Sequence, residues 1–136
     1  SFTKEISLGD VVIVESECLG DTGSQDHEEL LDLFDLEFIQ KNEFPYFDGL
    51  LVNPFVSAIE GWKKVRSLTV NTGSGNQHTI NLRQTKYQPE IESMEGACLH
   101  YACLMEKIPC IQFRGISNYV EPRDKSKWKI NYLYFF

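Results

Sequence analysis

The hydrophobic pattern divides the chain into short apolar stretches that are separated by polar and glycine-containing segments. The first stretch, residues 11–14 (Val-Val-Ile-Val), is a run of β-branched residues that follows the turn Leu8-Gly9-Asp10. A run of this kind, without polar alternation, is typical of a strand that is buried on both faces. It therefore predicts a strand in the middle of a sheet.

The next segment, residues 15–26, is polar and contains Gly20 and Gly23, which predicts a loop. Asp26 followed by Glu29 has the spacing of a capping box ahead of apolar residues. Those apolar residues are Leu30, Leu31, Leu33 and Phe34. The pattern predicts a short helix at this point.

Aromatic residues and turn formers dominate residues 43–49, and a short apolar run follows at 50–54. Such a loop usually covers a core, and the alternative is a ligand lid. Residues 55–61 are expected to form one or two helical turns. Alternation over residues 64–72 then predicts a strand that ends in the glycine-containing loop 73–76.

That loop contains only Gly73-x-Gly75, and no Gly-Lys-Ser/Thr follows it. The pattern therefore favours a turn over a phosphate-binding loop. Residues 79–86 predict a short helix that ends before Pro89, and residues 91–93 predict a strand.

The last third of the chain carries two polar positions that are expected to meet. Glu95 stands where a helix should begin, and a buried strand from Ile111 should end in the polar pair Ser117-Asn118. In open α/β sheets, ligands bind beyond the carboxyl ends of the strands, where helix N-termini converge. His100, within the helix, is expected to pack or to lie at the surface. The helix surface expected to pack on the sheet comprises Cys98, Leu99, Ala102, Cys103 and Met105.

Composition narrows the class of protein. The 136 residues are 42% hydrophobic, enough for a packed core, and carry a formal net charge of -7 with a sequence pI of about 4.9. This acidic balance argues against nucleic acid and anionic membrane surfaces as partners. Apolar runs fall short of the roughly 20 residues that span a bilayer, and the first residues do not resemble a signal peptide. A cytoplasmic protein is expected.

Cysteines and histidines do not indicate a metal site. The four cysteines show no Cys-x-x-Cys spacing and are interpreted as small buried hydrophobes: Cys18, Cys98, Cys103 and Cys110. The three histidines are scattered without ligand spacing. We expect no metal and no redox cofactor.

Two motifs resemble those of the nucleoside phosphorylase and nucleosidase superfamily. One is Glu92-Ser93-Met94-Glu95-Gly96-Ala97, and the other is Arg114-Gly115-Ile116-Ser117-Asn118, which continues through residues 119–123 to Lys127-Trp128. Together they are most similar to the futalosine hydrolases of the menaquinone pathway. The resemblance covers residues 8–128. It implies an α/β fold with a mixed central sheet flanked by helices, a purine nucleoside substrate, no cofactor, and a homo-oligomer.

The resemblance also implies that the Gly9-Asp10 strand lies well inside a longer polypeptide. Residues 1–136 are therefore expected to be a single partial nucleosidase domain, its C-terminal part. The first strand and a catalytic acidic residue would belong to the missing N-terminal part. Residues 129–136 form an aromatic run, where the family has an amphipathic helix.

The resemblance assigns ribose binding to Glu95. A carboxylate can accept hydrogen bonds from both vicinal hydroxyls of a ribose, and its charge favours the cation that develops on the sugar. The alternative is an acidic residue that only complements the helix macrodipole. Met94 is expected to pack against the sugar, and Ser93, Thr72 and Gly73 are further candidate substrate contacts.

Asn118 takes the position of the residue that relieves negative charge on the leaving purine. Relatives that cleave adenine nucleosides usually have an aspartate there, which can protonate N7. Asparagine offers one acceptor and two donors, which suit a 6-oxopurine such as hypoxanthine. The alternative is an asparagine that only ends the strand in a turn.

Two arginines complete the expected picture. Arg114 lies on an apolar strand and is expected to form a structural ion pair with Glu92 or Glu121. Arg123, or a lysine in the same charged loop, is a candidate to bind a carboxylate on the substrate.

The expected function is hydrolysis of the N-glycosidic bond of futalosine, with Glu95 and Asn118 as catalytic residues and hypoxanthine as the leaving base. Another purine nucleosidase or a phosphorylase of the same fold is one alternative. A non-catalytic nucleoside-binding fragment is the other. The 136 residues alone are expected to be inactive or very weak.

Overall fold

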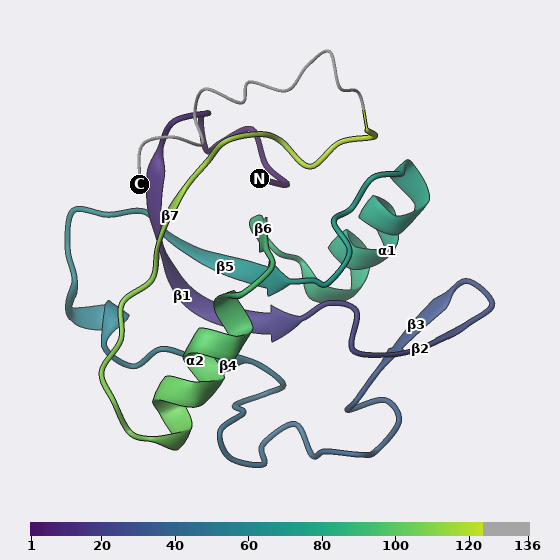
Figure 1. The fold of residues 1–136 in the computed structure, drawn as a ribbon, viewed down its shortest axis with the longest axis horizontal. Helices are drawn as coiled ribbons and strands as arrows, with labels where there is room; N and C mark the ends of the chain where they lie inside the picture. Colours follow the sequence, from purple (N-terminus) through teal and green to yellow (C-terminus); the bar gives the residue numbers. More distant parts are fainter. Residues whose placement is uncertain (124–136) are drawn as a thin grey trace.

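The structure is a computed structural model that describes residues 1–123. Its centre is a five-stranded sheet built around the long strand β1 (Val11–Leu19), as Figure 1 shows. Strand β1 pairs in parallel with β5 (Lys64–Thr69), and β5 pairs in parallel with β6 (Ile91–Ser93). The carboxyl ends of these three strands therefore lie at one edge of the sheet.

Two short strands run antiparallel to β1. Strand β7 (Phe113–Gly115) pairs with residues 11–13, and β4 (Leu51–Val52) pairs with Ser16 and Glu17. Because β1 has partners on β4, β5 and β7, the prediction that it lies in the middle of the sheet is confirmed. The sheet is mixed, and the predicted α/β class is confirmed as well.

Two α-helices flank this sheet, α1 (Gln77–Tyr87) and α2 (Gly96–Met105), together with the 3-10 turn η1 (Val56–Ala58). Helix α1 begins after Asn76, whose side chain accepts a hydrogen bond from the amide of Thr79 at 2.9 Å. The predicted elements at 64–72, 79–86 and 91–93, the helix after Glu95 and the turn within 55–61 are all present.

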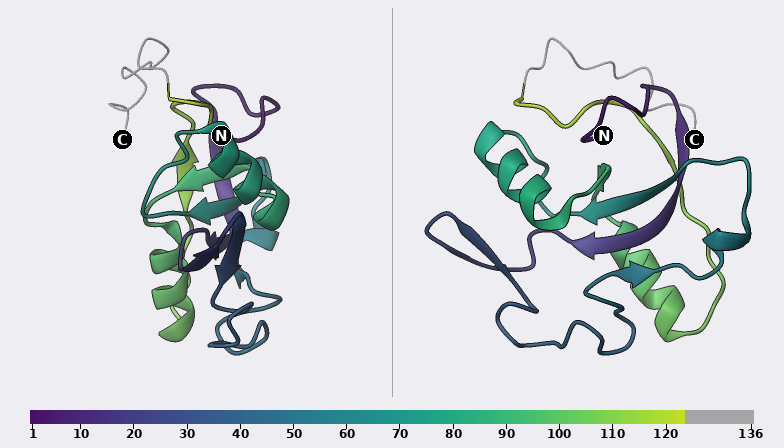
Figure 2. Two further views of the ribbon diagram at one scale, coloured as in Figure 1. Left: turned by 90° about the vertical axis from the view of Figure 1, so that its right-hand side faces the viewer. Right: turned by 180° about the vertical axis from the view of Figure 1, so that it is seen from behind.

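Residues 15–32 differ from the sequence prediction. Strand β1 continues to Leu19, and a hairpin follows, formed by β2 (Gly23–Asp26) and β3 (Glu29–Asp32). The predicted capping box fails because Asp26 and Glu29 face each other across the hairpin, with His27 in the left-handed region at φ 51°. The predicted helix at 30–34 is therefore absent. Figure 2 shows the hairpin extending away from the main sheet.

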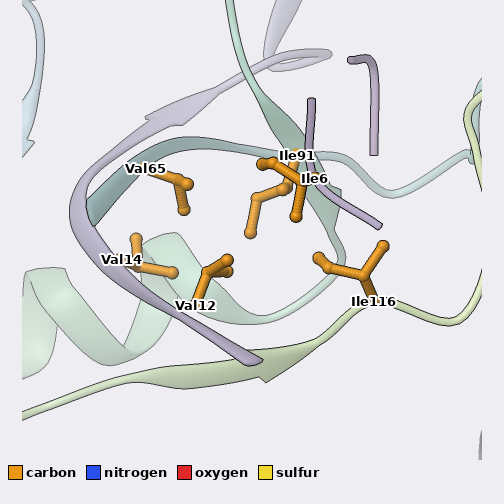
Figure 3. Packing of buried hydrophobic residues seen from close by; sticks show 6 residues of the cluster. All are labelled: Ile6, Val12, Val14, Val65, Ile91 and Ile116. Carbon is orange, nitrogen blue, oxygen red and sulfur yellow. The ribbon is translucent and has the colours of Figure 1, made fainter. Parts of the chain in front are cut away.

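The hydrophobic core lies against β1, β5 and β6. Six buried side chains point toward one another in Figure 3 and form its larger cluster: Ile6, Val12, Val14, Val65, Ile91 and Ile116. A smaller cluster lies farther along the strands and contains Cys18, Leu68 and Val70. Burial of each such aliphatic side chain contributes about 1.5–3 kcal/mol, so these clusters hold the sheet in place.

The buried side of α2 is not the predicted one. The buried residues of the helix are Gly96, Ala97 and His100, whereas Leu99 and Met105 are 43% and 44% exposed. The helix meets the sheet through the small residues of its first turn and through His100, which faces the Leu51 carbonyl of β4. The larger apolar side chains Leu99 and Met105 face outward. Of the cysteines predicted to be buried, only Cys18 is; Cys98 is exposed, and Cys103 and Cys110 are half-buried.

Strand β7 is also more open than predicted. Ile111 and Phe113 are 49% and 46% exposed, although Ile116 is buried in the core. Phe113 packs edge-on against Trp62, with 5.0 Å between the ring centroids. The strand is three residues long and pairs with the beginning of β1, which leaves much of its surface uncovered.

The aromatic segment at 43–49 covers the core only in part. Tyr46 packs against Phe34 and Tyr101, at ring-centroid distances of 5.2 and 6.2 Å. Phe44 and Phe47 are 62% and 71% exposed. The prediction of a loop that covers the core is therefore wrong for these two side chains.

Within residues 1–123, no helix is both long enough and apolar enough to cross a membrane. The predictions made for Lys127-Trp128, for the lysines of the charged loop and for the aromatic run 129–136 lie outside the described residues.

Candidate active site

Helix α2 begins directly over a buried carboxylate of β1. Glu17 is fully buried, and a Cβ atom at Gly96 would lie 1.7 Å from its Oε1 atom. Only a glycine lets the backbone approach so closely. The glycine that follows Glu95 in the first motif is therefore required by the position of Glu17.

Two hydroxyl groups connect the start of α2 to Glu17. Thr69 Oγ1 donates to Glu17 Oε2 at 2.8 Å and accepts from the amide of Ala97 at 2.8 Å. Because its one proton goes to Glu17, Ser93 Oγ at 3.2 Å acts as the donor toward Thr69. Ser93 also accepts from the amide of Gly96 at 3.3 Å. The helix start is thereby fixed to the carboxyl ends of β5 and β6.

Glu95 precedes this helix with its carboxylate in solvent. Its side chain is 74% exposed and lies 3.7 Å from Arg114, measured from Oε2 to Nη1. It makes no capping hydrogen bond with the helix, whereas an acidic residue that serves as a cap bonds the amides of the first turn. Met94 beside it is 55% exposed. Both side chains are accessible to a ligand at the helix start.

Arg114 is held by an amide rather than by the predicted carboxylates. Its Nε and Nη2 atoms donate to Gln112 Oε1 at 3.1 and 2.7 Å. Gln112 Nε2 in turn donates to Glu17 Oε1 at 2.8 Å. The predicted partners Glu92 and Glu121 are wrong, since the carboxylate within ion-pair distance of Arg114 is that of Glu95.

Glu92 instead holds the glycine-containing loop that follows β5. Its Oε1 atom accepts from the amide of Ser74 at 2.9 Å, and its Oε2 atom accepts from the Ser74 hydroxyl at 2.5 Å. Arg83 of α1, only 4% exposed, donates to the Thr72 carbonyl and the Ser74 hydroxyl at 2.8 Å each. It also pairs with Glu92 at 3.4 Å and with Asp21 at 3.3 Å. The Ser74 amide is thus already bonded to an anion, which favours the predicted turn over a phosphate-binding loop.

The structure brings five of the six predicted site residues to one edge of the sheet. Thr72 and Gly73 follow β5 and are exposed, and the Thr72 amide donates to Asp21 at 3.0 Å. Ser93, Met94 and Glu95 end or follow the neighbouring parallel strand β6. The register pair Thr69 and Ser93 places these two segments side by side.

The contacts of Asn118 place it toward the opposite edge of the sheet. Strand β7 runs antiparallel to β1, so its carboxyl end does not share the edge formed by β1, β5 and β6. The main-chain carbonyl of Asn118 and the carbonyl of Glu90, which immediately precedes β6, both accept hydrogen bonds from Ser1. No contact among residues 1–123 joins Asn118 to Glu95, and their meeting at one site stays a prediction.

The side chain of Asn118 is exposed and bonded only to its neighbours in the described part of the chain. Its Oδ1 atom accepts from the Ser117 hydroxyl at 2.8 Å, and its Nδ2 atom donates to the Tyr119 carbonyl at 3.0 Å. Its main-chain carbonyl accepts from the amine of Ser1 at 2.7 Å. The amide group can therefore exchange its local bonds for those of a ligand.

Titratable groups near the site have structural roles. His100 is buried, as the packing prediction allowed, with Nδ1 3.2 Å from the carbonyl oxygen of Leu51, and burial lowers its pKa. Burial raises the pKa of the Cys18 thiol to about 12. It also raises that of Cys110 to about 11, with a further contribution from Cys103. These thiols remain protonated at neutral pH and are poor nucleophiles.

Sequence reasoning missed the buried polar residues that support the site. Glu17 lies in a segment predicted to be a loop, and its neighbours Glu15 and Ser16 made the segment look polar. Gln112 lies in a strand predicted to be apolar. Arg83 carried no motif at all. The signal that could have extended the strand past residue 14 is the apolar pair Cys18-Leu19, which follows the three polar residues and precedes Gly20.

Comparison with known proteins identifies the fold. The chain is 29% identical to the futalosine hydrolase of Streptomyces coelicolor over 133 residues, which are 95% of this chain and 54% of that protein. The native futalosine hydrolase of Helicobacter pylori superposes with a TM-score of 0.67 at 16% identity, covering 89% of this chain and 52% of its own. The chain has the nucleosidase fold. No protein-family model matches the chain.

A second solved structure supports the same fold. The 5′-methylthioadenosine/S-adenosyl homocysteine nucleosidase of H. pylori, complexed with a pyrrolopyrimidine-pyrrolidinol ligand, superposes with a TM-score of 0.66 at 16% identity, over 89% of this chain and 52% of its own. The resemblance stated from the two motifs is confirmed. The chain spans about half the length of each of these relatives, and its assignment as a C-terminal partial domain stays a prediction.

Proposed function

We propose that the chain is part of a nucleosidase that hydrolyses the N-glycosidic bond of futalosine and releases hypoxanthine. The observation that carries the proposal concerns the carboxylate of Glu95 at the start of α2. It makes no capping hydrogen bond with the helix and lies beside Arg114. Sequence similarity to a futalosine hydrolase supports the choice of substrate.

The proposed chemistry places charge where the reaction needs it. The two oxygens of Glu95 accept hydrogen bonds from the 2′ and 3′ hydroxyls of the ribose. As the C1′–N9 bond breaks, its electron pair leaves with the purine and the sugar becomes cationic. The nearby carboxylate stabilises that cation more strongly than the neutral ground state. Met94, exposed beside it, packs against the sugar.

Asn118 acts on the leaving base. Its Nδ2 group donates to N7 of the purine, where negative charge accumulates, and its Oδ1 atom is available as an acceptor. A neutral amide cannot protonate N7, which suits a 6-oxopurine better than adenine. Water adds to C1′ and gives one proton to a base that we assign to protein outside these 136 residues, and the released purine anion takes up one proton from solvent. The isolated chain is accordingly expected to be inactive or very weak.

Three further assignments accompany the proposal. Arg123 follows the second motif and is a candidate for the carboxylate of futalosine. Ser93, Thr72 and Gly73 supply additional substrate contacts at the ends of β6 and β5. A cytoplasmic homo-oligomer is the expected form of the whole protein.

The test is release of hypoxanthine from futalosine by the longest open reading frame that contains this chain, with and without phosphate. Glu95→Gln and Asn118→Ala are compared with Glu106→Gln, which makes the same change as the first variant at the other end of α2. We expect phosphate-independent release that falls at least about 100-fold in both site variants, as for removal of one group that stabilises charge in the transition state. The control variant should keep its rate.

Other outcomes assign other functions. Release that requires phosphate would identify a phosphorylase. Release from 5′-methylthioadenosine but not from futalosine would move the proposal to adenine nucleosides. Calorimetric binding of a nucleoside without turnover of either substrate would identify a binding protein. Full activity of Glu95→Gln would remove the assigned role of that residue.

A further inference from the structure

The fully buried carboxylate of Glu17 has no role in the mechanism above. Among residues 1–123 it forms no ion pair with a lysine or arginine. Its hydrogen bonds come from Thr69 and Gln112, both at 2.8 Å. A carboxylate without a cation is costly to bury and is retained in a core only when its hydrogen bonds are satisfied. Its two partners lead to two sides of the candidate site.

On one side, Glu17 decides how the amide of Gln112 is oriented. An ionised carboxylate only accepts hydrogen bonds, so the Gln112 group that faces it must be Nε2. An arginine only donates, so the Gln112 atom that faces Arg114 must be Oε1. Gln112 lies between these two groups with bonds of 2.8, 3.1 and 2.7 Å. The carboxylate and the guanidinium therefore each require the same orientation of one amide.

Arg114 connects the fixed amide of Gln112 to Glu95. Two of its donors are fixed on a single oxygen of Gln112, which sets the plane of the guanidinium. Its third nitrogen, Nη1, then faces Glu95 Oε2 at 3.7 Å. Glu95 itself is 74% exposed, and Arg114 is its ion-pair partner in the described part of the chain. The position of the ribose-binding carboxylate thus depends on Arg114.

On the other side, Glu17 fixes the backbone next to Glu95. Thr69 gives its proton to Glu17 and accepts from the amide of Ala97 at 2.8 Å. Gly96, between Glu95 and Ala97, lies against Glu17 itself. The side chain and the backbone of Glu95 are therefore both linked to the same buried carboxylate.

From this closed chain of contacts we infer that Glu17 is a positioning residue for Glu95, acting through Gln112 and Arg114 on the side chain and through Thr69 on the start of α2. The inference rests on the proposed function for the role of Glu95. It also predicts a change in the distance between Arg114 and Glu95, which can be measured without an activity assay.

The first variant is Glu17→Gln in the longest open reading frame, with Glu15→Gln as the matched control because Glu15 is exposed on the same strand. The new amide has one oxygen where Glu17 has two, so it turns a donor toward either Gln112 Nε2 or Thr69 Oγ1. In the first case Gln112 loses this bond or turns its own donors toward Arg114. In the second case Thr69, which holds the amide of Ala97, loses the acceptor for its proton. We expect kcat/KM for the ribonucleoside to fall about 10- to 100-fold, the range seen when a supporting residue is lost.

The second variant exchanges the two residues, Glu17→Gln together with Gln112→Glu. The amide at 17 then accepts from Thr69 and donates to the carboxylate at 112, which accepts from Arg114. The order of donors and acceptors is restored with the same total volume. We expect the double variant to regain activity to within a few-fold of the unmodified protein. A double variant that folds and is no better than Glu17→Gln would overturn the inference.

A 2′-deoxynucleoside substrate separates positioning from general damage. If Glu17 acts through Glu95, the loss caused by Glu17→Gln should shrink on this substrate, because one hydroxyl that Glu95 binds is gone. An equal loss on both substrates would show that Glu17 only maintains the fold.

A crystal structure of Glu17→Gln provides the readout that needs no activity. We expect the separation between Arg114 Nη1 and Glu95 Oε2 to exceed the 3.7 Å of the unmodified protein. An unchanged separation would refute the inference even if the variant were slow. An unmodified protein that releases no purine would refute the proposed function instead, and the crystal structure would still decide the positioning role.

Discussion

The absence of a side chain at Gly96 determines how closely α2 can approach the sheet. At Gly96, a Cβ would lie 1.7 Å from Glu17 Oε1 and 2.8 Å from Gln112 Oε1. Neither oxygen can move freely, because each already accepts a hydrogen bond that the site uses. The glycine of the first motif is thus explained by sterics and not by backbone flexibility.

We predict that Gly96→Ala destabilises the protein by about 2 kcal/mol, within the usual range for overpacking of a core. The better helix propensity of alanine would offset about 1 kcal/mol of the clash. Urea unfolding of the purified protein measures the difference. Gly73→Ala is the control, because its Cβ would meet only Glu92 Oε1 at 3.7 Å. Equal stability of the two variants would mean that the helix start is free to shift.

The sequence alone allowed some residues of the candidate site to be proposed, but not all of them. Glu95 and Asn118 belong to recognisable motifs, so their positions could be proposed from the sequence. The role of Glu17 could not be proposed, because the sequence does not distinguish a glutamate buried in a strand from one exposed in a loop. Only the contacts with Thr69 and Gln112 distinguish the two cases.

Among the elements, α1 acts as a brace for two loops. The side chain of Arg83 on this helix contacts Asp21, which follows β1, and the Thr72–Ser74 turn, which follows β5. Its side chain is only 5% exposed, and the paired side chains of Asp21 and Glu92 are 19% and 13% exposed. One buried cation therefore compensates two mostly buried anions.

We predict that Arg83→Met destabilises the protein by about 3–5 kcal/mol, because it leaves uncompensated buried charge. The turn at 72–74 should also exchange its amide hydrogens faster. Chemical denaturation and hydrogen exchange measure the two effects. Arg66→Met, at an exposed position of β5, serves as the control. Similar values for both variants would contradict a bracing role for α1.

The helices and parallel strands of the second half could be predicted because their patterns are local. Asn76 caps the start of α1, and Gln88, with a left-handed backbone conformation, ends it. Each of these signals involves only a few neighbouring residues. The hairpin β2–β3 could not be predicted from Asp26 and Glu29, since one spacing fits a capping box and a two-residue turn equally. The backbone at His27, with φ 51°, decides for the turn.

At the scale of the whole molecule, the buried imidazole of His100 makes stability depend on pH. Burial lowers the pKa of His100 below its ordinary value of 6.5, so the unfolded chain binds a proton at a higher pH than the folded protein. Stability is therefore complete above about pH 6.5 and decreases as pH falls toward the folded pKa. The slope from this residue is at most about 1.4 kcal/mol per pH unit.

We predict that the free energy of unfolding falls between pH 7.5 and pH 5.5, and that His100→Gln shows a smaller fall over this interval. His78→Gln, at an exposed position of α1, should behave like the unmodified protein. Urea titrations at the two pH values measure all three. An identical pH dependence in His100→Gln would assign the fall to other groups.

The placement of β1 has a consequence for synthesis of the chain. Val11 pairs with Gly115, so the edge of β1 at residues 11–13 has no partner until about a hundred more residues have been translated. At about 5–20 residues per second, this strand waits on the ribosome for roughly 5–20 s. During that time its Val-Val-Ile-Val segment is open to binding by a chaperone or by another nascent chain.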